Sequence, residues 1–150
     1  MSEIVAIEPV RRSIMVDCPV EEAFRVFTTE IASWWPLLTH SIGGENVEQL
    51  VFEERAGGEV YEVAKDGTRA HWADVLAWEP PRRFVLDWHV NPAEPATELE
   101  VRFAGEDAGT RVELEHRGWE RLGERADEAR GHYDSGWVSV LGQFEDRANG

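Results

Sequence analysis

From Val47 to Arg117 the hydrophobic residues recur at every second position, and this alternation constrains the fold more than any other feature of the chain. A period of two is that of a β-strand with one buried face. Short turn sequences interrupt the pattern, among them Ala56-Gly57-Gly58 and Asp66-Gly67, which are typical of hairpin connections. Strands joined in this way pair with their neighbours, so the segment predicts a meander of six antiparallel strands.

A strand and a helical segment precede the meander. Residues 11–17 alternate as one further strand. The apolar residues that follow have the i, i+3, i+4, i+7 spacing of an amphipathic helix: Val20, Ala23, Phe24 and Phe27. The pattern loosens toward Trp35 and Pro36, where we expect the helical segment to stop or turn.

A long helix is predicted to close the chain. Its apolar residues share one face: Tyr133, Trp137, Val140, Leu141 and Phe144. No other element is long enough to cover one face of a bent six-stranded sheet. The fold class is therefore α+β, and because no linker marks a second unit we expect a single domain over 1–150, with its core at about 11–147.

Composition excludes several classes of partner. The chain has 30 acidic and 15 basic residues, a net charge of −15, and such a surface repels nucleic acid and anionic membranes. No apolar run is long enough to span a membrane, and the first ten residues show no secretory signal. The one cysteine, Cys18, allows no internal disulfide, so we expect a cytoplasmic protein.

The sequence motifs of metal and cofactor sites are missing. The five histidines lack the spacing of a metal site: His40, His71, His89, His116 and His132. The chain also has no HExxH, CxxC, phosphate-loop or GxSxG motif. We therefore expect no metal, no cofactor and no catalytic set of these kinds.

Seven tryptophans are an unusually large number for 150 residues. Trp72 and Trp88 fall on two strands and Trp137 on the closing helix, so these indoles form either an aromatic core or the wall of a ligand cavity. Glycines inside the closing helix, such as Gly136, cost about 1 kcal/mol each relative to alanine. That cost favours the cavity, because glycine lets a helix backbone approach another group closely.

His116 lies on the inward face of the strand over residues 109–117, with Trp119 close behind it. Three roles are open for it: a core histidine whose ring nitrogens are satisfied, a polar anchor for a ligand in a cavity, or a general base. The last role needs a carboxylate partner. Strict alternation also turns Glu59 and Asp74 inward, where each would lie at a wet rim, pair with an arginine such as Arg69, or act in function. A one-residue shift in register would instead turn both outward.

Four stretches together resemble one known family: Gly57-Gly58, Trp78 to Arg83, Gly109 to Trp119, and Gly136-Trp137. They are similar to the SRPBCC (START-like, helix-grip) superfamily, and most of all to its bacterial branch related to the activator of heat-shock-protein-90 ATPase. The resemblance covers about Arg11 to Arg147. It implies a strand, two short helices and a six-stranded meander, curved around the long C-terminal helix with a cavity between them.

The resemblance also implies which residues line that cavity and bind a small hydrophobic or aromatic molecule. They are Trp35, Tyr61, Trp72, Trp88, Val101, His116, Trp119, Tyr133, Trp137 and Leu141. The superfamily supplies no invariant catalytic set that could be transferred to this chain.

Three functions follow as hypotheses. The first is binding of a small hydrophobic or aromatic ligand without a cofactor. The second is a cofactor-independent enzyme of the polyketide cyclase or hydrolase type in the same cavity, with His116 as its base. The third is a co-chaperone of the stress response that stimulates a chaperone ATPase through its surface, with a chaperone or a second copy as partner.

Overall fold

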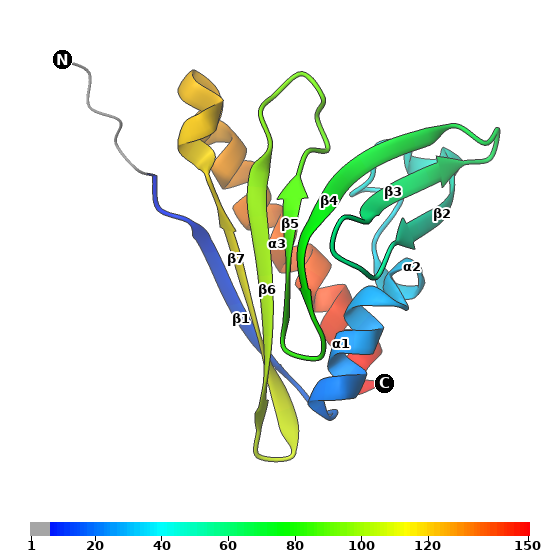
Figure 1. Ribbon diagram of the computed structural model, residues 1–150, viewed down its shortest axis with the longest axis vertical. Coiled ribbons are helices and arrows are strands. Elements are labelled where there is room, and N and C mark those ends of the chain that lie inside the picture. The colour runs from blue at the N-terminus through cyan, green and yellow to red at the C-terminus, as the bar shows by residue number, and fades with distance from the viewer. Residues whose placement is uncertain (1–6) are drawn as a thin grey trace.

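In the computed structural model, which describes residues 7–150, seven strands form one antiparallel sheet in the order β1-β7-β6-β5-β4-β3-β2 (Figure 1). Their bounds are β1 Val10–Val16, β2 Val47–Phe52, β3 Glu59–Ala64, β4 Arg69–Glu79, β5 Arg83–Trp88, β6 Thr97–Glu106 and β7 Gly109–Arg117. The predicted six-stranded meander is confirmed, and β1 extends it by pairing with β7. The expectation about a secretory signal falls partly on residues 1–6, outside the described residues.

The helices are α1 Val20–Thr28, α2 Ile31–Trp34 and α3 Ala126–Asn149, with 3₁₀ turns at Gly44–Asn46 and Trp119–Arg125. The helical segment predicted before Pro36 is thus two short helices, separated at Thr29 and Glu30. The long helix α3 lies against one face of the curved sheet, and α1 packs beside it (Figure 1). This arrangement confirms the α+β helix-grip fold. None of the described helices combines the length and apolar character that crossing a membrane requires.

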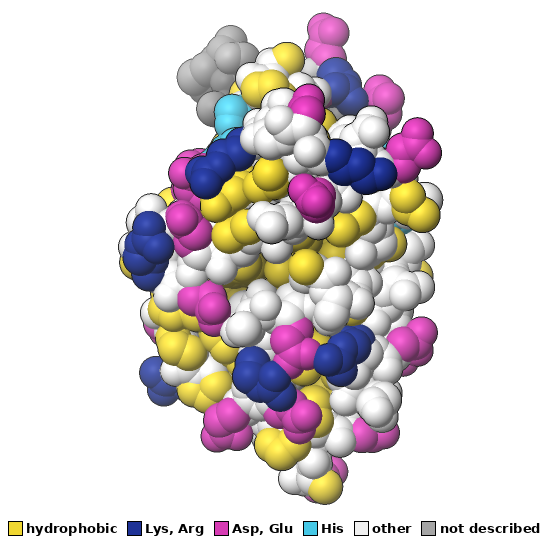
Figure 2. Space-filling view, turned by 90° about the vertical axis from the view of Figure 1, so that its right-hand side faces the viewer, with side chains coloured by type: hydrophobic (Ala, Val, Ile, Leu, Met, Phe, Trp, Pro, Cys, Tyr) yellow, Lys and Arg dark blue, Asp and Glu magenta, His cyan; other side chains and the backbone are white. Residues whose placement is uncertain are grey.

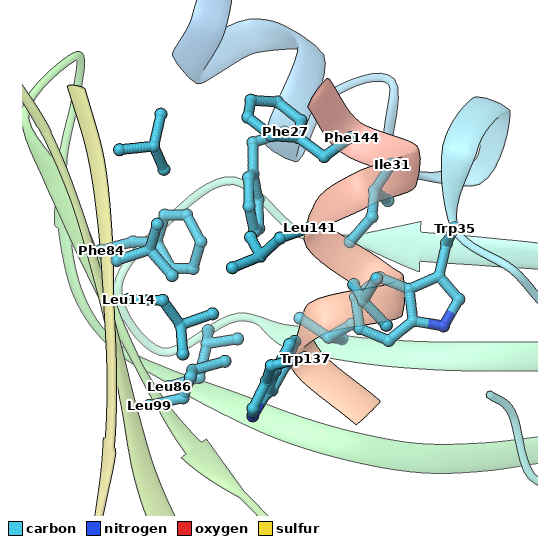
Figure 3. Close-up of a cluster of buried hydrophobic side chains, with 14 of the residues drawn as sticks. Phe27, Ile31, Trp35, Phe84, Leu86, Leu99, Leu114, Trp137, Leu141 and Phe144 are labelled. Carbon is cyan, nitrogen blue, oxygen red and sulfur yellow. The ribbon is translucent and has the colours of Figure 1, made fainter. Parts of the chain in front are cut away.

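The core lies where the C-terminal half of α3 meets the sheet. Leu141 and Phe144 project from α3 toward the strands, and Phe27 of α1 packs on Phe144 with ring centroids 4.9 Å apart (Figure 3). The facing strand residues in this cluster are Phe84, Leu86, Leu99 and Leu114. Close packing here fills the space between helix and sheet.

Two β-bulges in β4 break the strict alternation assumed from the sequence. Val60 pairs with Ala73 while Tyr61 pairs with His71, so Trp72 is an extra residue in β4. A second register shift leaves Leu76 unpaired against β5. An extra residue reverses the faces of those that follow it, which explains why Trp72 is buried while Leu76 is 51% exposed.

The faces of β3 and β4 differ from those predicted, because the inward row of β3 is Val60 and Glu62 and because β4 carries the bulges. Val60 belongs to the core cluster, whereas Tyr61 lies on the outer face under the guanidinium of Arg69, 4.3 Å from the ring centroid. Glu59 and Asp74 also lie on the outer face, with side chains 45% and 53% exposed. Both contact His71, through Nδ1 at 2.9 Å and Nε2 at 3.5 Å, so neither is a buried acid.

Charges of both signs are mixed over the surface. On the face in Figure 2, acidic and basic side chains alternate, with apolar side chains between them. On the outer face of the sheet, Arg117 contacts Glu98, Glu100 and Glu115 at 2.8 Å each. Many of the 15 basic side chains are therefore engaged in ion pairs, and the excess of 15 negative charges remains on the surface.

Candidate functional site

A cavity of about 390 Å³, partly open to solvent, lies beside the middle of α3, from His132 to Val140. It is bounded by α3, by the loop after α2, and by β4 and the end of β5. Its lining includes five aromatic side chains, Trp35, Trp72, Trp88, Tyr133 and Trp137, and the smaller or polar residues Thr39, His40, Ser41, Val90, His132, Ser135, Gly136, Ser139 and Val140.

The indoles form a continuous wall. The ring centroid of Trp35 is 5.2 Å from that of Trp72, 6.4 Å from that of Trp88 and 5.9 Å from that of Trp137. Trp35 enters from the segment after α2, and Trp137 projects from α3 toward the sheet (Figure 3). Rings at such distances and tilts stabilise one another through aromatic contacts.

Each indole N–H of the wall is bonded inside the protein. Trp35 donates to the carbonyl oxygen of His40 at 2.8 Å, and Trp72 donates to Oε1 of Glu62 at 2.7 Å. Trp88 and Trp137 donate to Tyr133 Oη at 3.2 Å and to His116 Nδ1 at 3.0 Å. What the indoles offer to the cavity is therefore apolar π surface.

Glu62 connects the loop after α2 to the sheet. Its carboxylate is 2% exposed and accepts the backbone N–H groups of Ile42 and Gly43 at 2.7 and 2.8 Å, besides the indole N–H of Trp72. Three donors offset the cost of burying this carboxylate. The loop that carries Thr39, His40 and Ser41 is thereby fixed against the cavity wall.

His116 is a core histidine, one of the three roles the sequence left open. It is fully buried, does not line the cavity, and accepts from Trp137 at Nδ1. An indole N–H only donates, so the ring proton is on Nε2, which donates to Thr97 Oγ1 at 2.7 Å. Burial lowers the pKa of His116 to about 3, which keeps the ring neutral. The geometry is that of neither a ligand anchor nor a general base.

Five of the ten residues inferred from the resemblance line the cavity: Trp35, Trp72, Trp88, Tyr133 and Trp137. The others do not, because the cavity borders α3 only from His132 to Val140 and the strands only at Trp72 and Trp88. Val101 and Leu141 are buried in the packed core, and Tyr61 faces away from it. Trp119 lines a separate cavity of only about 20 Å³.

Sequence reasoning missed the polar part of the lining. Gly136 lies one helical turn before Val140, so helical spacing was the available signal for it, whereas Ser135 and Ser139 are exposed and lie beyond the apolar face of α3. His40 gave no such signal, because the long-range bonds of Glu62 position its loop. The close approach expected of the helix glycines holds at Gly136, where an added Cβ would lie 3.8 Å from the His40 ring. It fails at Gly131 and Gly142, which face open space.

Within residues 7–150, no group of three or more His, Cys, Asp or Glu side chains is arranged to hold a metal ion. Glu59 and Asp74 both contact His71, but on the outer face of the sheet and away from the cavity. The candidate site is therefore the aromatic cavity.

Comparison with known families identifies the fold's relatives. Residues 17–149 match the family described as "Activator of Hsp90 ATPase homolog 1-like protein". The chain belongs to this family. The match covers α1 to α3 and all strands after β1, and it confirms the resemblance inferred from the sequence motifs. No curated protein matches the chain.

Solved structures extend the comparison. An anthrahydroquino-gamma-pyrone synthase, Txn09, shares 32% identity over 94% of this chain and 97% of its own, with a TM-score of 0.62. CalC, a self-sacrificing resistance protein from Micromonospora echinospora, shares 25% identity over 94% of both chains, with a TM-score of 0.72. An Aha1 dimer from Colwellia psychrerythraea has a TM-score of 0.70 at 13% identity over 95% of this chain and 97% of its own, which is a likeness of fold.

Proposed function

We propose that this family member binds a small, flat, hydrophobic molecule, an aromatic one above all, in the cavity beside α3. The observation that carries the proposal is the wall: five aromatic side chains border about 390 Å³, and every indole N–H among them is bonded within the protein. Small-molecule sites are typically concave, mostly apolar and about 300–1,000 Å³ in volume. A wall of π surface favours a ligand that presents ring faces and edges.

The comparison with Txn09 supports a fused-ring ligand. That protein is named as a synthase of an anthrahydroquino-gamma-pyrone, and its sequence matches nearly the whole of this chain. A fused aromatic plane is the shape that the indole wall accommodates best.

The experiment is a titration with a panel of aromatic polyketides, flavonoids, sterols and fatty acids, followed by tryptophan fluorescence and by thermal shift. Two variants locate the site. Gly136→Leu places a side chain in the cavity, whereas Gly142→Leu places one in open space on the same helix. Both remove a helix glycine, so their effects on helix propensity match.

We expect aromatic members of the panel to quench the fluorescence and raise the melting temperature of the wild type and of Gly142→Leu. Gly136→Leu should bind at least tenfold more weakly, because its side chain occupies the ligand's space. Equal affinity in the two variants, or no response to any aromatic compound, would contradict the proposal.

A second candidate is a cofactor-independent enzyme in the same cavity. Two observations favour it: the 32% identity to a synthase, and the position of the His40 ring, which reaches α3 at Gly136. In such an enzyme His40 would be the base in place of His116, since both ring nitrogens of His116 are already hydrogen-bonded. Conversion of a bound panel compound to a new product, followed by mass spectrometry, separates an enzyme from a binder.

A co-chaperone role is the remaining alternative, and the family's description supports it. It requires a chaperone partner on the outer surface and tolerates changes in the cavity, so stimulation of a chaperone ATPase that survives Gly136→Leu would favour it. We place the protein in the cytoplasm, since its single cysteine, Cys18, is free and buried, as in proteins of reducing compartments.

A further inference from the structure

Tyr133 presents a hydrogen-bond donor at the cavity. Its oxygen accepts the indole N–H of Trp88 at 3.2 Å, and both residues line the main cavity and the small one beside it. An indole N–H can only donate, so the hydroxyl proton of Tyr133 stays available for another acceptor. Burial raises the pKa of Tyr133, which keeps this hydroxyl protonated.

His40 presents a second polar atom from the opposite side. Its Nδ1 lies 2.7 Å from Thr39 Oγ1, while no hydrogen bond of residues 7–150 uses its Nε2. That nitrogen faces α3, where a Cβ added at Gly136 would lie 3.9 Å from it. A hydroxyl both donates and accepts, so a ligand hydroxyl suits Nε2 in either tautomer.

The other polar groups of the lining are either occupied or exposed. Ser41 Oγ donates to the carbonyl of Leu37 and accepts the N–H of Gly44. His132, Ser135 and Ser139 are exposed on α3, where water satisfies them. His40 Nε2 and Tyr133 Oη are therefore the two polar atoms most able to select a ligand.

Resting on the proposed function, we infer that the ligand is a planar phenolic ketone. A carbonyl oxygen accepts the hydroxyl proton of Tyr133, and a ring hydroxyl bonds to Nε2 of His40, while the ring system packs against the indole wall. The two residues act as specificity determinants, since a plain hydrocarbon of the same shape would leave both unused.

Three probes with the same three-ring plane test this inference: anthracene, 9,10-anthraquinone and 2-hydroxy-9,10-anthraquinone. Their dissociation constants are measured by tryptophan quenching on the wild type, Tyr133→Phe and His40→Phe. One net hydrogen bond corresponds to about a 2- to 10-fold change in affinity. On the wild type we expect affinity to rise from anthracene to the quinone and again to the hydroxyquinone.

The two variants show which residue is responsible for each increase in affinity. Tyr133→Phe should remove the gain of the quinone over anthracene, and His40→Phe should remove the further gain of the hydroxyquinone. Anthracene should bind all three proteins within about twofold, which shows that the cavity keeps its shape. Two results would overturn the inference and leave the proposed function standing. One is equal affinity of the wild type for all three probes, and the other is that a variant loses as much affinity for anthracene as for the quinones. Failure of all three probes to bind the wild type would also overturn the inference, and the panel titration would then decide the proposed function separately.

Discussion

Lowering the pH from 7 to 5 is expected to destabilise this protein by about 2 kcal/mol through a single buried side chain, His116. In the folded protein its pKa is about 3, because burial disfavours the charged ring. In the unfolded chain the ordinary value of 6.5 returns. The unfolded state therefore binds more protons between these values. The stabilisation that neutral His116 contributes is therefore complete above about pH 6.5 and is lost as the pH falls toward 3.

Urea unfolding at pH 7, 6 and 5 measures the effect. Over this range the contribution of carboxylates with lowered pKa, such as those of Glu106 and Glu115, stays small, because their ordinary value is 4.5. His116→Gln keeps an acceptor for Trp137 and a donor for Thr97 but does not titrate, so its stability should be nearly flat from pH 7 to 5. Thr97→Val should be less stable yet keep the slope. An unchanged slope in His116→Gln would contradict the assignment.

The second large effect is expected at Trp137. Replacing this indole, which is 2% exposed, by alanine should lower the free energy of unfolding by about 3–5 kcal/mol. The cost combines lost burial, an enlarged cavity and an acceptor on His116 left without its donor. Urea unfolding at pH 7 measures it.

Val138 is the matched control for this prediction. It is the next residue of α3 and its side chain is 53% exposed, so Val138→Ala should change stability by less than about 0.5 kcal/mol. The loss of unfolding free energy in Trp137→Phe should lie between those of the two alanine variants, because phenylalanine keeps a ring in the core but cannot donate the hydrogen bond. A loss below about 1 kcal/mol in Trp137→Ala would show that the indole is not a structural part of the wall.

The sequence predicted the architecture because its two periods, two residues in the meander and 3.6 in the helices, each belong to one kind of element. The prediction was wrong where a β-bulge interrupted the two-residue period. The extra residue at Trp72 could not be seen in an alternating pattern, and it moved Asp74 to the outer face. In β3 the alternation holds, but its inward residues are Val60 and Glu62, so Glu59 and Tyr61 lie on the outer face. A bulge is set by pairing with the neighbouring strand, which the sequence of one strand does not specify.

The candidate site was predictable in its apolar half only. Trp88 and Trp137 followed from the faces of a strand and a helix. The polar half depends on bonds between distant residues: Glu62 holds the loop of His40, and Thr97 with Trp137 satisfies His116. No spacing along the chain encodes such pairs, which is why the histidine inferred to line the cavity lies in the core and His40 was overlooked.

The indole wall depends on groups behind it. Glu62, Tyr133, His116 and the backbone carbonyl of His40 each accept one indole N–H, so each of the four rings is held by a directional bond as well as by packing. A wall fixed in this way keeps its shape without a ligand, and little ordering is needed on binding.

The crystal structure of the protein with the tightest-binding aromatic compound tests the central claim most directly. We expect one molecule in the cavity, with its ring system packed on the indoles of Trp35 and Trp88 and with one edge against α3 at Gly136. A compound bound outside the cavity, with the indole wall closed over empty space, would contradict the claim and direct the search for function to the outer surface.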